Sequence, residues 1–376
     1  MAAGLLLRSF SKLATLDIGF DRNNVLLVGA DLKTAKVPPE RQLATFEEIE
    51  TRLGALPGVV SIGRSVITPV GDGGWNQWIL TDWSRALTAH DSLSWSNCVS
   101  PGFFQTLRMP LLAGRDFNSG DTKTSPSVAI VNQTLARRFF PNLNPIDKTF
   151  WIVDRGGNPG PPVEVVGLVK DAKYWSVRED SDPTAFFPAT QAPAIAMFEA
   201  ETFELRTATP PSALMGPIQA AVAGVNKEIP LEFHTLAEQV SDTLVQERLL
   251  AVLSAFFGGL ALLLAMIGLY GALSYMVTRR QAEFGIRMAL GAEAGSILRL
   301  VMRDVAVILA GGIVAGALIS FAATPVLAKL LFGLGPRDVR TIIGAAAVLS
   351  AVGVVAGYLP ARRATKVHPI VALRCE

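Results

Sequence analysis

Three long runs without a charged side chain constrain this sequence more than any other feature. They cover residues 249–277, 305–328 and 341–361. An α-helix rises 1.5 Å per residue, so about 20 apolar residues cross a hydrocarbon core roughly 30 Å thick. Buried helices of soluble proteins seldom remain uncharged over such lengths. The runs therefore predict three transmembrane helices, which also explains why 50% of the 376 residues are hydrophobic.

Basic residues beside the runs predict the orientation, because cytoplasmic segments are enriched in Lys and Arg. The first loop and the C-terminal tail carry nine of them, and the connection between the second and third runs carries three. The nine are Arg279, Arg280, Arg287, Arg299, Arg303, Arg362, Arg363, Lys366 and Arg374. The loop and the tail are thus predicted to be cytoplasmic. The large N-terminal domain of this multi-pass protein is then extracytoplasmic, which in a bacterium means the periplasm or the cell exterior.

Residues 1–20 are expected to be the remnant of a preceding membrane helix with its connector. Residues 1–7 are apolar but too short to span a bilayer. No basic segment precedes them, as a signal peptide would require. A surface helix is the alternative interpretation. Because something must lead the next domain across the membrane, a missing first helix is expected, and it would make the chain a fragment.

Residues 21–235 are predicted to form an α+β domain. Strand-like segments at 24–31 and 59–66 flank a helix that begins at Pro39, and segments at 202–207 and 229–234 flank a helix that begins at Pro210. Two separated β-α-β units indicate one two-layer part built from both ends of the domain. Residues 68–200 between them are expected to be an inserted, mainly β part. Its Trp75, Trp78, Trp83 and Trp95 form either a binding surface or core anchors.

Residues 236–376 are expected to comprise a stalk helix and the all-α membrane domain. Thr235 and Glu238 form a capping-box pattern that starts the stalk, which is expected to run unbroken into the first membrane run. Gly312, Gly316 and Ser320 recur every four residues on the second run. The third run has a similar stripe at Ala346, Ser350, Gly353 and Gly357. Small residues at this spacing allow close helix packing in lipid, although simple alanine and glycine richness would produce the same pattern.

Several function classes find no support in the sequence. It contains no G-x-x-x-x-G-K-[ST] phosphate loop and no G-x-S-x-G elbow. His90, His234 and His368 lie in no metal-ligand spacing, and Cys98 and Cys375 are expected on opposite sides of the membrane. A net charge of +2 does not indicate nucleic acid. We therefore expect no enzyme, no catalytic residue, no metal and no cofactor bound by this chain.

The loop at 278–292 is the candidate site. It contains Arg279, Arg280, Glu283, Phe284, Gly285, Arg287, Met288 and Gly291. Glu283 and Arg287 are four residues apart, in the order that favours a helical ion pair. Phe284 and Met288 share a helical face that could enter a groove on a partner. The alternative is an amphipathic helix on the membrane surface.

These motifs together resemble a known family. The 279–292 pattern and the ending at 358–374 are similar to MacB/FtsX-type ABC transporter permeases. The segments at 100–104, 112–117 and 131–141 resemble the MacB-like periplasmic core domain, especially in the C-terminal half of duplicated acidobacterial permeases. Two departures lie in the tail, where His368 replaces a usual acid and Cys375 a usual aromatic residue.

The resemblance implies one helix, a periplasmic core domain and then three helices, with a core domain made of a porter-like part and an inserted β part. It implies that the 278–292 loop holds a coupling helix for a separate ABC ATPase subunit, which would bind the ATP. It also implies a homodimer or a paired permease half, and a further periplasmic partner. The expected function is export or mechanotransmission in an ABC-type system with an unknown substrate. The alternatives are an FtsX-like regulator of a cell-envelope enzyme and a non-functional fragment.

Overall fold

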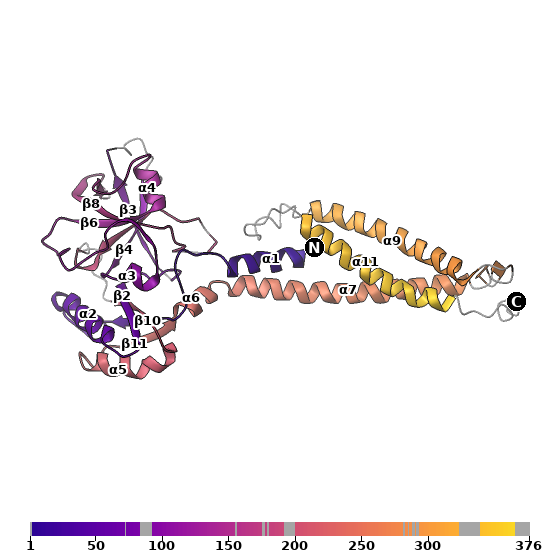
Figure 1. Cartoon of the computed structure of the whole chain (residues 1–376), viewed down its shortest axis with the longest axis horizontal. Helices are drawn as coiled ribbons and strands as arrows, with labels where there is room; N and C mark the ends of the chain where they lie inside the picture. The colour runs from indigo at the N-terminus through magenta and orange to yellow at the C-terminus, as the bar shows by residue number, and fades with distance from the viewer. Residues whose placement is uncertain are drawn as a thin grey trace. The chain divides into compact units, whose positions relative to one another are not determined.

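The chain divides into two units in the computed structural model (Figure 1). The helical unit comprises Met1–Thr15 and Leu244–Glu376, and the mixed unit comprises Leu16–Thr243. The structure describes residues 2–71, 73–82, 92–154, 156–174, 177–178, 180–191, 200–280, 283–284, 286–287, 290, 293–322 and 339–364.

An open, antiparallel sheet in the order β11-β1-β10-β2 forms one part of the mixed unit. Its strands are β1 (Val25–Asp31), β2 (Val59–Ser65), β10 (Ala200–Thr207) and β11 (Leu231–Thr235). Helix α2 (Pro39–Gly54) connects β1 to β2, and a short 3-10 turn (Pro211–Leu214) followed by α5 (Met215–Ala223) connects β10 to β11. Each strand-helix-strand unit therefore contributes two of the four strands.

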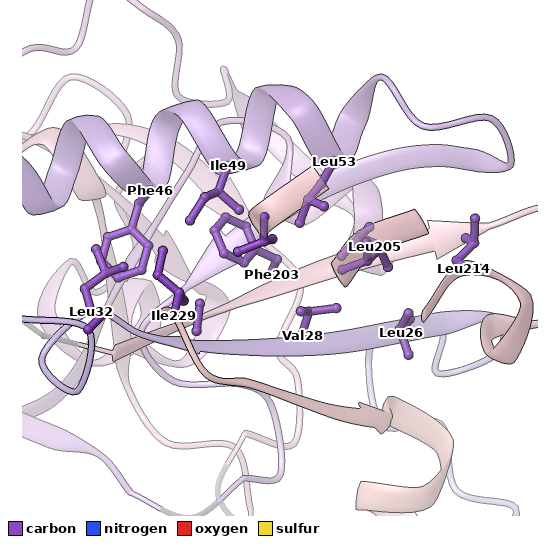
Figure 2. Packing of buried hydrophobic residues seen from close by; sticks show 14 residues of the cluster. Leu26, Val28, Leu32, Phe46, Ile49, Leu53, Phe203, Leu205, Leu214 and Ile229 are labelled. Atoms are coloured by element: carbon purple, nitrogen blue, oxygen red, sulfur yellow. The ribbon is translucent and has the colours of Figure 1, made fainter. Parts of the chain in front are cut away.

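Helices α2 and α5 pack on one face of this sheet, because alternate strand residues and one stripe of each helix are apolar. Figure 2 shows Phe46, Ile49 and Leu53 of α2 above strand residues of β1 and β10. All three helix residues are buried, and the Phe46 ring lies 6.2 Å from that of Phe203. This shared apolar layer holds the two strand-helix-strand units together.

The intervening segment forms a closed six-stranded barrel in the order β4-β3-β7-β8-β6-β9, which the parallel pairing of β9 with β4 closes. The strands are β3 (Trp75–Leu80), β4 (Leu93–Val99), β6 (Val128–Asn132), β7 (Thr149–Val153), β8 (Pro159–Val169) and β9 (Thr184–Pro188). A short strand, β5 (Leu111–Gly114), pairs with β8. Within the described residues, the ladder between β2 of the open sheet and β4 of the barrel consists of one residue pair, Ser65 opposite Val99.

Two short helices accompany the barrel. Helix α4 (Gln133–Phe139) begins where the sequence predicts, because the Asn132 side chain accepts a hydrogen bond of 2.9 Å from the Leu135 amide. Leu135 and Phe139 of α4 are buried in the barrel's hydrophobic cluster together with Phe150 and Val165. Helix α3 (Phe103–Leu107) packs on β2 and β10. The observed mixed α/β domain confirms the predicted class at that level.

A buried polar network lies where the open sheet meets the barrel. The Arg64 guanidinium is almost fully buried and pairs with Glu50 (Nε to Oε2, 3.2 Å) and with Glu201. Burial raises the pKa of the Glu201 carboxyl, although Arg64 opposes this effect. Burial likewise raises the pKa of the Glu204 carboxyl, whose Oε1 accepts from the Ser65 hydroxyl while its buried Oε2 has no hydrogen-bond partner.

The helical unit contains α1 (Ala2–Ala14), α7 (Val245–Arg279), α9 (Ala294–Ala322) and α11 (Val339–Ala364). The segments Val245–Arg279, Gly295–Ala322 and Ile343–Arg362 are long and apolar enough to cross a membrane, which confirms the prediction of three spans. Helix α11 packs against both α7 and α9, and α1 packs along α7 with Leu5, Ser9 and Leu13 buried (Figure 1).

The expected unbroken stalk is wrong. The capping box of Thr235 and Glu238 is present and starts α6 (Leu236–Asp242). However, two residues, 243 and 244, separate the end of α6 from the start of α7 at Val245. At the break, the Thr243 hydroxyl donates to the Val240 carbonyl (2.8 Å). Such local side-chain bonds compete with regular helix geometry. The sequence has no Pro or Gly at this position, so it did not predict the break.

Candidate functional site

The loop between α7 and α9 continues the helical geometry of α7 for short stretches. The Phe284 amide donates to the Arg280 carbonyl (3.0 Å), and the Leu290 amide donates to the Ile286 carbonyl (3.0 Å). Both bonds span four residues, as in an α-helix. Gly285, Met288 and Gly291 of the predicted site lie outside the described residues, as do Gln281, Ala282, Ala289 and Ala292.

Phe284 is a core residue and not a free docking side chain. Only 2% of it is exposed, and it clusters with residues of all three long helices: Val277, Ile297, Val301 and Ala361. In this structure the Phe284 ring is packed inside the chain, so the predicted role of Phe284 in a partner's groove stays a prediction. The physical reason for this packing is that an aromatic ring gains more from burial between three apolar helices than from exposure at their end.

Two ion pairs fix the polar side of the loop. The expected pair forms between Arg287 Nη2 and Glu283 Oε1 at 2.6 Å, one helical turn apart. Arg280 Nη1 lies 3.2 Å from Asp304 Oδ2 of α9. These side chains are each at least one-third exposed, so the pairs orient the loop and add little stability. Arg279 is exposed beside them.

Among the described residues of the loop, Ile286 and Leu290 provide the accessible apolar surface. Leu290 is 83% exposed and Ile286 is 50% exposed. They are four residues apart and joined by a helical hydrogen bond, so they lie on one face. Sequence reasoning missed them because Phe284 and Met288 have the same spacing. Only the tertiary burial of Phe284 distinguishes the two faces.

The two small-residue stripes differ in their packing. A Cβ on Gly353 would lie 2.5 Å from Leu309 of α9, and one on Gly357 would lie 2.9 Å from Val305, so α11 approaches α9 closely at both positions. A Cβ on Gly312 or Gly316 would meet no atom within 4 Å. The third-run stripe thus forms a helix contact inside the chain, and Gly312 and Gly316 do not. Ser320 and Ser350 are half-buried.

The predicted tryptophan surface does not form one face. Trp75 and Trp78 are three residues apart on β3, so they point to opposite sides of the strand. Trp75 packs against the barrel core, whereas Trp78 is 39% exposed. Trp95 of β4 lies opposite Asn76 of β3, and Asn76 and Trp78 are on the same side of β3. Trp95 therefore shares the outer side with Trp78. Trp83 lies outside the described residues.

Cys98 and the candidate ionisable residues form no reactive or metal site in the described part of the chain. Cys98 is 1% exposed, and burial raises the pKa of its thiol. The described residues hold no group of three or more His, Cys, Asp or Glu that could bind a metal ion. His234 is exposed, and His90, His368 and Cys375 lie outside the described residues.

Three helices long and apolar enough to cross a membrane, in one chain with a large mixed α/β domain, are the parts of a permease-type membrane protein. The model for the "MacB-like periplasmic core domain" matches residues 2–225, and the model for the "FtsX-like permease C-terminal" domain matches residues 255–369. The first of these alone covers more than half of the chain. The chain belongs to the MacB/FtsX-type ABC transporter permeases. This family and the three apolar helices support a membrane location with an extracytoplasmic domain.

The chain is also similar to individual proteins of known sequence or structure. The Macrolide export ATP-binding/permease protein MacB of Marinobacter nauticus is 26% identical over 74% of this chain, which spans 43% of that protein. The Uncharacterized ABC transporter permease YknZ of Bacillus subtilis is 24% identical over 74% of this chain and 70% of its own length. The solved periplasmic region of MacB from Actinobacillus actinomycetemcomitans is similar at a TM-score of 0.40 and 11% identity, over 61% of this chain and 97% of that one.

Proposed function

We propose that the chain is the permease subunit that couples a separate ABC ATPase to movement of its extracytoplasmic domain. The observation that carries this proposal is the loop between α7 and α9. It is anchored by the buried Phe284 and presents Ile286, Leu290 and Arg287 to solvent. An anchored turn with an exposed apolar pair and a basic residue suits docking into a groove of a partner protein. The ATPase would then bind the ATP.

The partner permease and the transported substrate belong to the same proposal. We assign a second permease copy or a paired permease half to the open side of α9, where a Cβ added at Gly312 or Gly316 would meet no atom of the described residues within 4 Å. The mixed unit would be the porter-like and β-inserted part that moves, and a periplasmic protein would receive its motion. If that periplasmic protein takes part in export of a substrate, the chain belongs to an ABC exporter. If it is a cell-envelope enzyme, the chain is an FtsX-like regulator.

Leu290→Asp is expected to uncouple the permease without unfolding it. A charge at this 83% exposed position has almost no folding cost but would be buried on docking. We expect co-purification of the ATPase and ATP-dependent activity to fall at least about tenfold, which corresponds to about 1.4 kcal/mol of binding.

Val60→Asp is the matched control, because Val60 is 63% exposed in the mixed unit. It should leave both measurements unchanged. Wild-type ATPase association of the Leu290→Asp chain would remove the docking role of this face.

Labelling with a membrane-impermeant thiol reagent should establish the orientation. Native Cys98 is buried and should stay unlabelled on either side until the protein is unfolded. Ser119 is exposed in the mixed unit, so Ser119→Cys combined with Cys375→Ser should label in intact spheroplasts. The chain with only its native cysteines should become labelled at Cys375 only after the spheroplasts are lysed. Labelling of Cys375 before lysis would contradict a cytoplasmic C-terminus.

A further inference from the structure

Two connectors link the mixed unit to the helical unit along the chain. The first connector, residues 16–24, follows α1, and the second is α6, which precedes α7. Neither connector is a free linker within the mixed unit. Ile18 and Phe20 of the first are buried, as are Leu236 and Val240 of the second. The contacts of each connector can therefore be followed into the domain.

The first connector is bound to the segment that follows β8. The Lys173 amide donates to the Ile18 carbonyl (2.8 Å), and Lys170 pairs with Asp17 (2.8 Å). Gly19 has a φ of +85°, and a Cβ there would lie 2.4 Å from the Asp171 carbonyl oxygen. Only glycine allows the connector to approach this closely.

The second connector is bound to a different segment, residues 67–71. The Gln239 side chain of α6 donates from Nε2 to the Thr68 hydroxyl (2.8 Å) and to the Pro69 carbonyl (2.9 Å). Gln239 comes directly after Glu238, which closes the capping box with Thr235, so the capped helix start fixes the position of Gln239. Contact between α6 and the 67–71 segment is thus specific and polar.

The two anchoring segments are bound directly to each other. The Val70 amide donates to the Tyr174 carbonyl (2.7 Å), and the Tyr174 hydroxyl donates to the Ile67 carbonyl (2.9 Å). Asn97 of β4 holds Ile67 at both its amide (3.1 Å) and its carbonyl (2.8 Å). An unbroken series of contacts therefore runs from α6 through 67–71 and 170–174 to residues 16–21, with the barrel strand β4 attached at its centre.

Val70 marks the middle of this series as conformationally unusual. Its φ is +59°, a region that a β-branched side chain rarely occupies. The residue is 2% exposed, and its amide bond to Tyr174 holds it there. Strained backbone persists only when the surrounding structure over-determines it. Loosening either connector should therefore let the 67–71 segment relax.

We propose that residues 67–71 and 170–174 form a link that energetically couples the two connectors, so that displacement of one loosens the other and the barrel strand between them. This inference concerns the mixed unit alone and holds whether or not the α7–α9 loop meets an ATPase. Coupling of this kind is reciprocal. Perturbing α6 must affect residues 16–21 and 170–174, and perturbing residues 16–21 must affect residues 67–71 and α6.

Hydrogen exchange of the full chain in lipid nanodiscs tests the first direction. Gln239→Ala removes both bonds to the 67–71 segment, and Thr68→Val removes one of them from the other side. We expect about tenfold faster exchange at the amides of Val70 and Lys173, with protection of β1 and β10 retained. Ser241→Ala is the control on the same helix, because the Ser241 hydroxyl bonds only the Ala237 carbonyl of α6. Unchanged exchange at Lys173 in both variants would overturn the proposal.

Gly19→Ala tests the reverse direction, because the added Cβ would press on Asp171. Exchange should then increase in 67–71 and in α6, beyond the altered connector itself. Gly157→Ala is the matched control, since Gly157 has the same φ of +85° but no atom within 4 Å of the Cβ position. An effect confined to residues 16–21 and 171–174 would show that the connectors are independent.

Discussion

Phe284→Asp is expected to disrupt the end of the helical unit that carries the α7–α9 loop, not merely to weaken a docking surface. The substitution removes a ring that is 2% exposed and places a carboxylate among Val277, Ile297 and Val301. Truncating a buried Phe costs about 3–5 kcal/mol in soluble cores, and burying an unpaired charge adds several more. Limited proteolysis of the chain in nanodiscs should show cleavage near residues 280–293 that the wild type resists.

Phe284→Leu and Leu290→Asp complete this comparison. Phe284→Leu keeps an apolar side chain in the cluster and should stay resistant to protease. Leu290→Asp should also stay resistant while losing the ATPase, because Leu290 is exposed. A protease-resistant Phe284→Asp chain would show that Phe284 is not an anchor, and the loop would then have to be positioned by its ion pairs.

Arg64→Met is expected to be the most destabilising single change in the mixed unit. It leaves Glu50 and Glu201 without their buried cation. Breaking a buried ion pair by removing one partner costs about 3–5 kcal/mol. All six tryptophans of the chain lie between residues 75 and 175, so tryptophan fluorescence of the full chain in detergent reports the thermal unfolding of this unit selectively.

The loss caused by Arg64→Met should depend on pH with a defined sign. Burial already raises the pKa of Glu201 in the wild type, and removing Arg64 removes the effect that opposes this shift. A carboxyl whose pKa is higher in the folded state favours folding most at pH values below its unfolded pKa of 4.5. This contribution to folding stability is lost as the pH rises through the folded-state pKa. The variant's deficit should therefore grow as pH is raised from about 5 towards 8.

Two controls separate the buried network from charge in general. Arg137→Met removes an ion pair with Asp171 in which the Arg137 side chain is 65% exposed, so it should cost little. Arg64→Met combined with Glu50→Gln and Glu201→Gln should recover much of the loss, because no unpaired charge remains buried. A pH-independent deficit in Arg64→Met would assign its cause to packing against Phe46, above whose ring the guanidinium lies at 5.2 Å.

The sequence predicted those features that depend on local pattern or on long apolar runs. The three spans follow from uncharged length, and the α4 start follows from Asn132 as a helix cap. The mixed α/β class follows from the periods of strands and helices. Each of these signals is local, and even the longest is one continuous stretch of the sequence, residues 249–277.

The features that the sequence did not predict depend on residues far apart in the chain. Barrel closure by β4 and β9 joins residues 95–99 to residues 184–188. The network of Arg64 with Glu201 spans 137 positions. The exposure of Leu290 and the burial of Phe284 reflect how three helices meet, since both residues have the same hydrophobic character. In each case only the tertiary arrangement decides between equivalent local patterns.

The place where the barrel is inserted has an evolutionary consequence. The chain leaves the open sheet after Ser65 and returns at β10, and Ser65 lies directly opposite Thr202 in the ladder of β2 and β10. The whole barrel therefore occupies the position of a hairpin loop between two paired strands. Insertions at such a position can be lengthened, shortened or exchanged while the strands that carry them keep their register. Permeases with this plan can thus acquire a different inserted part without altering the pairing of β2 with β10.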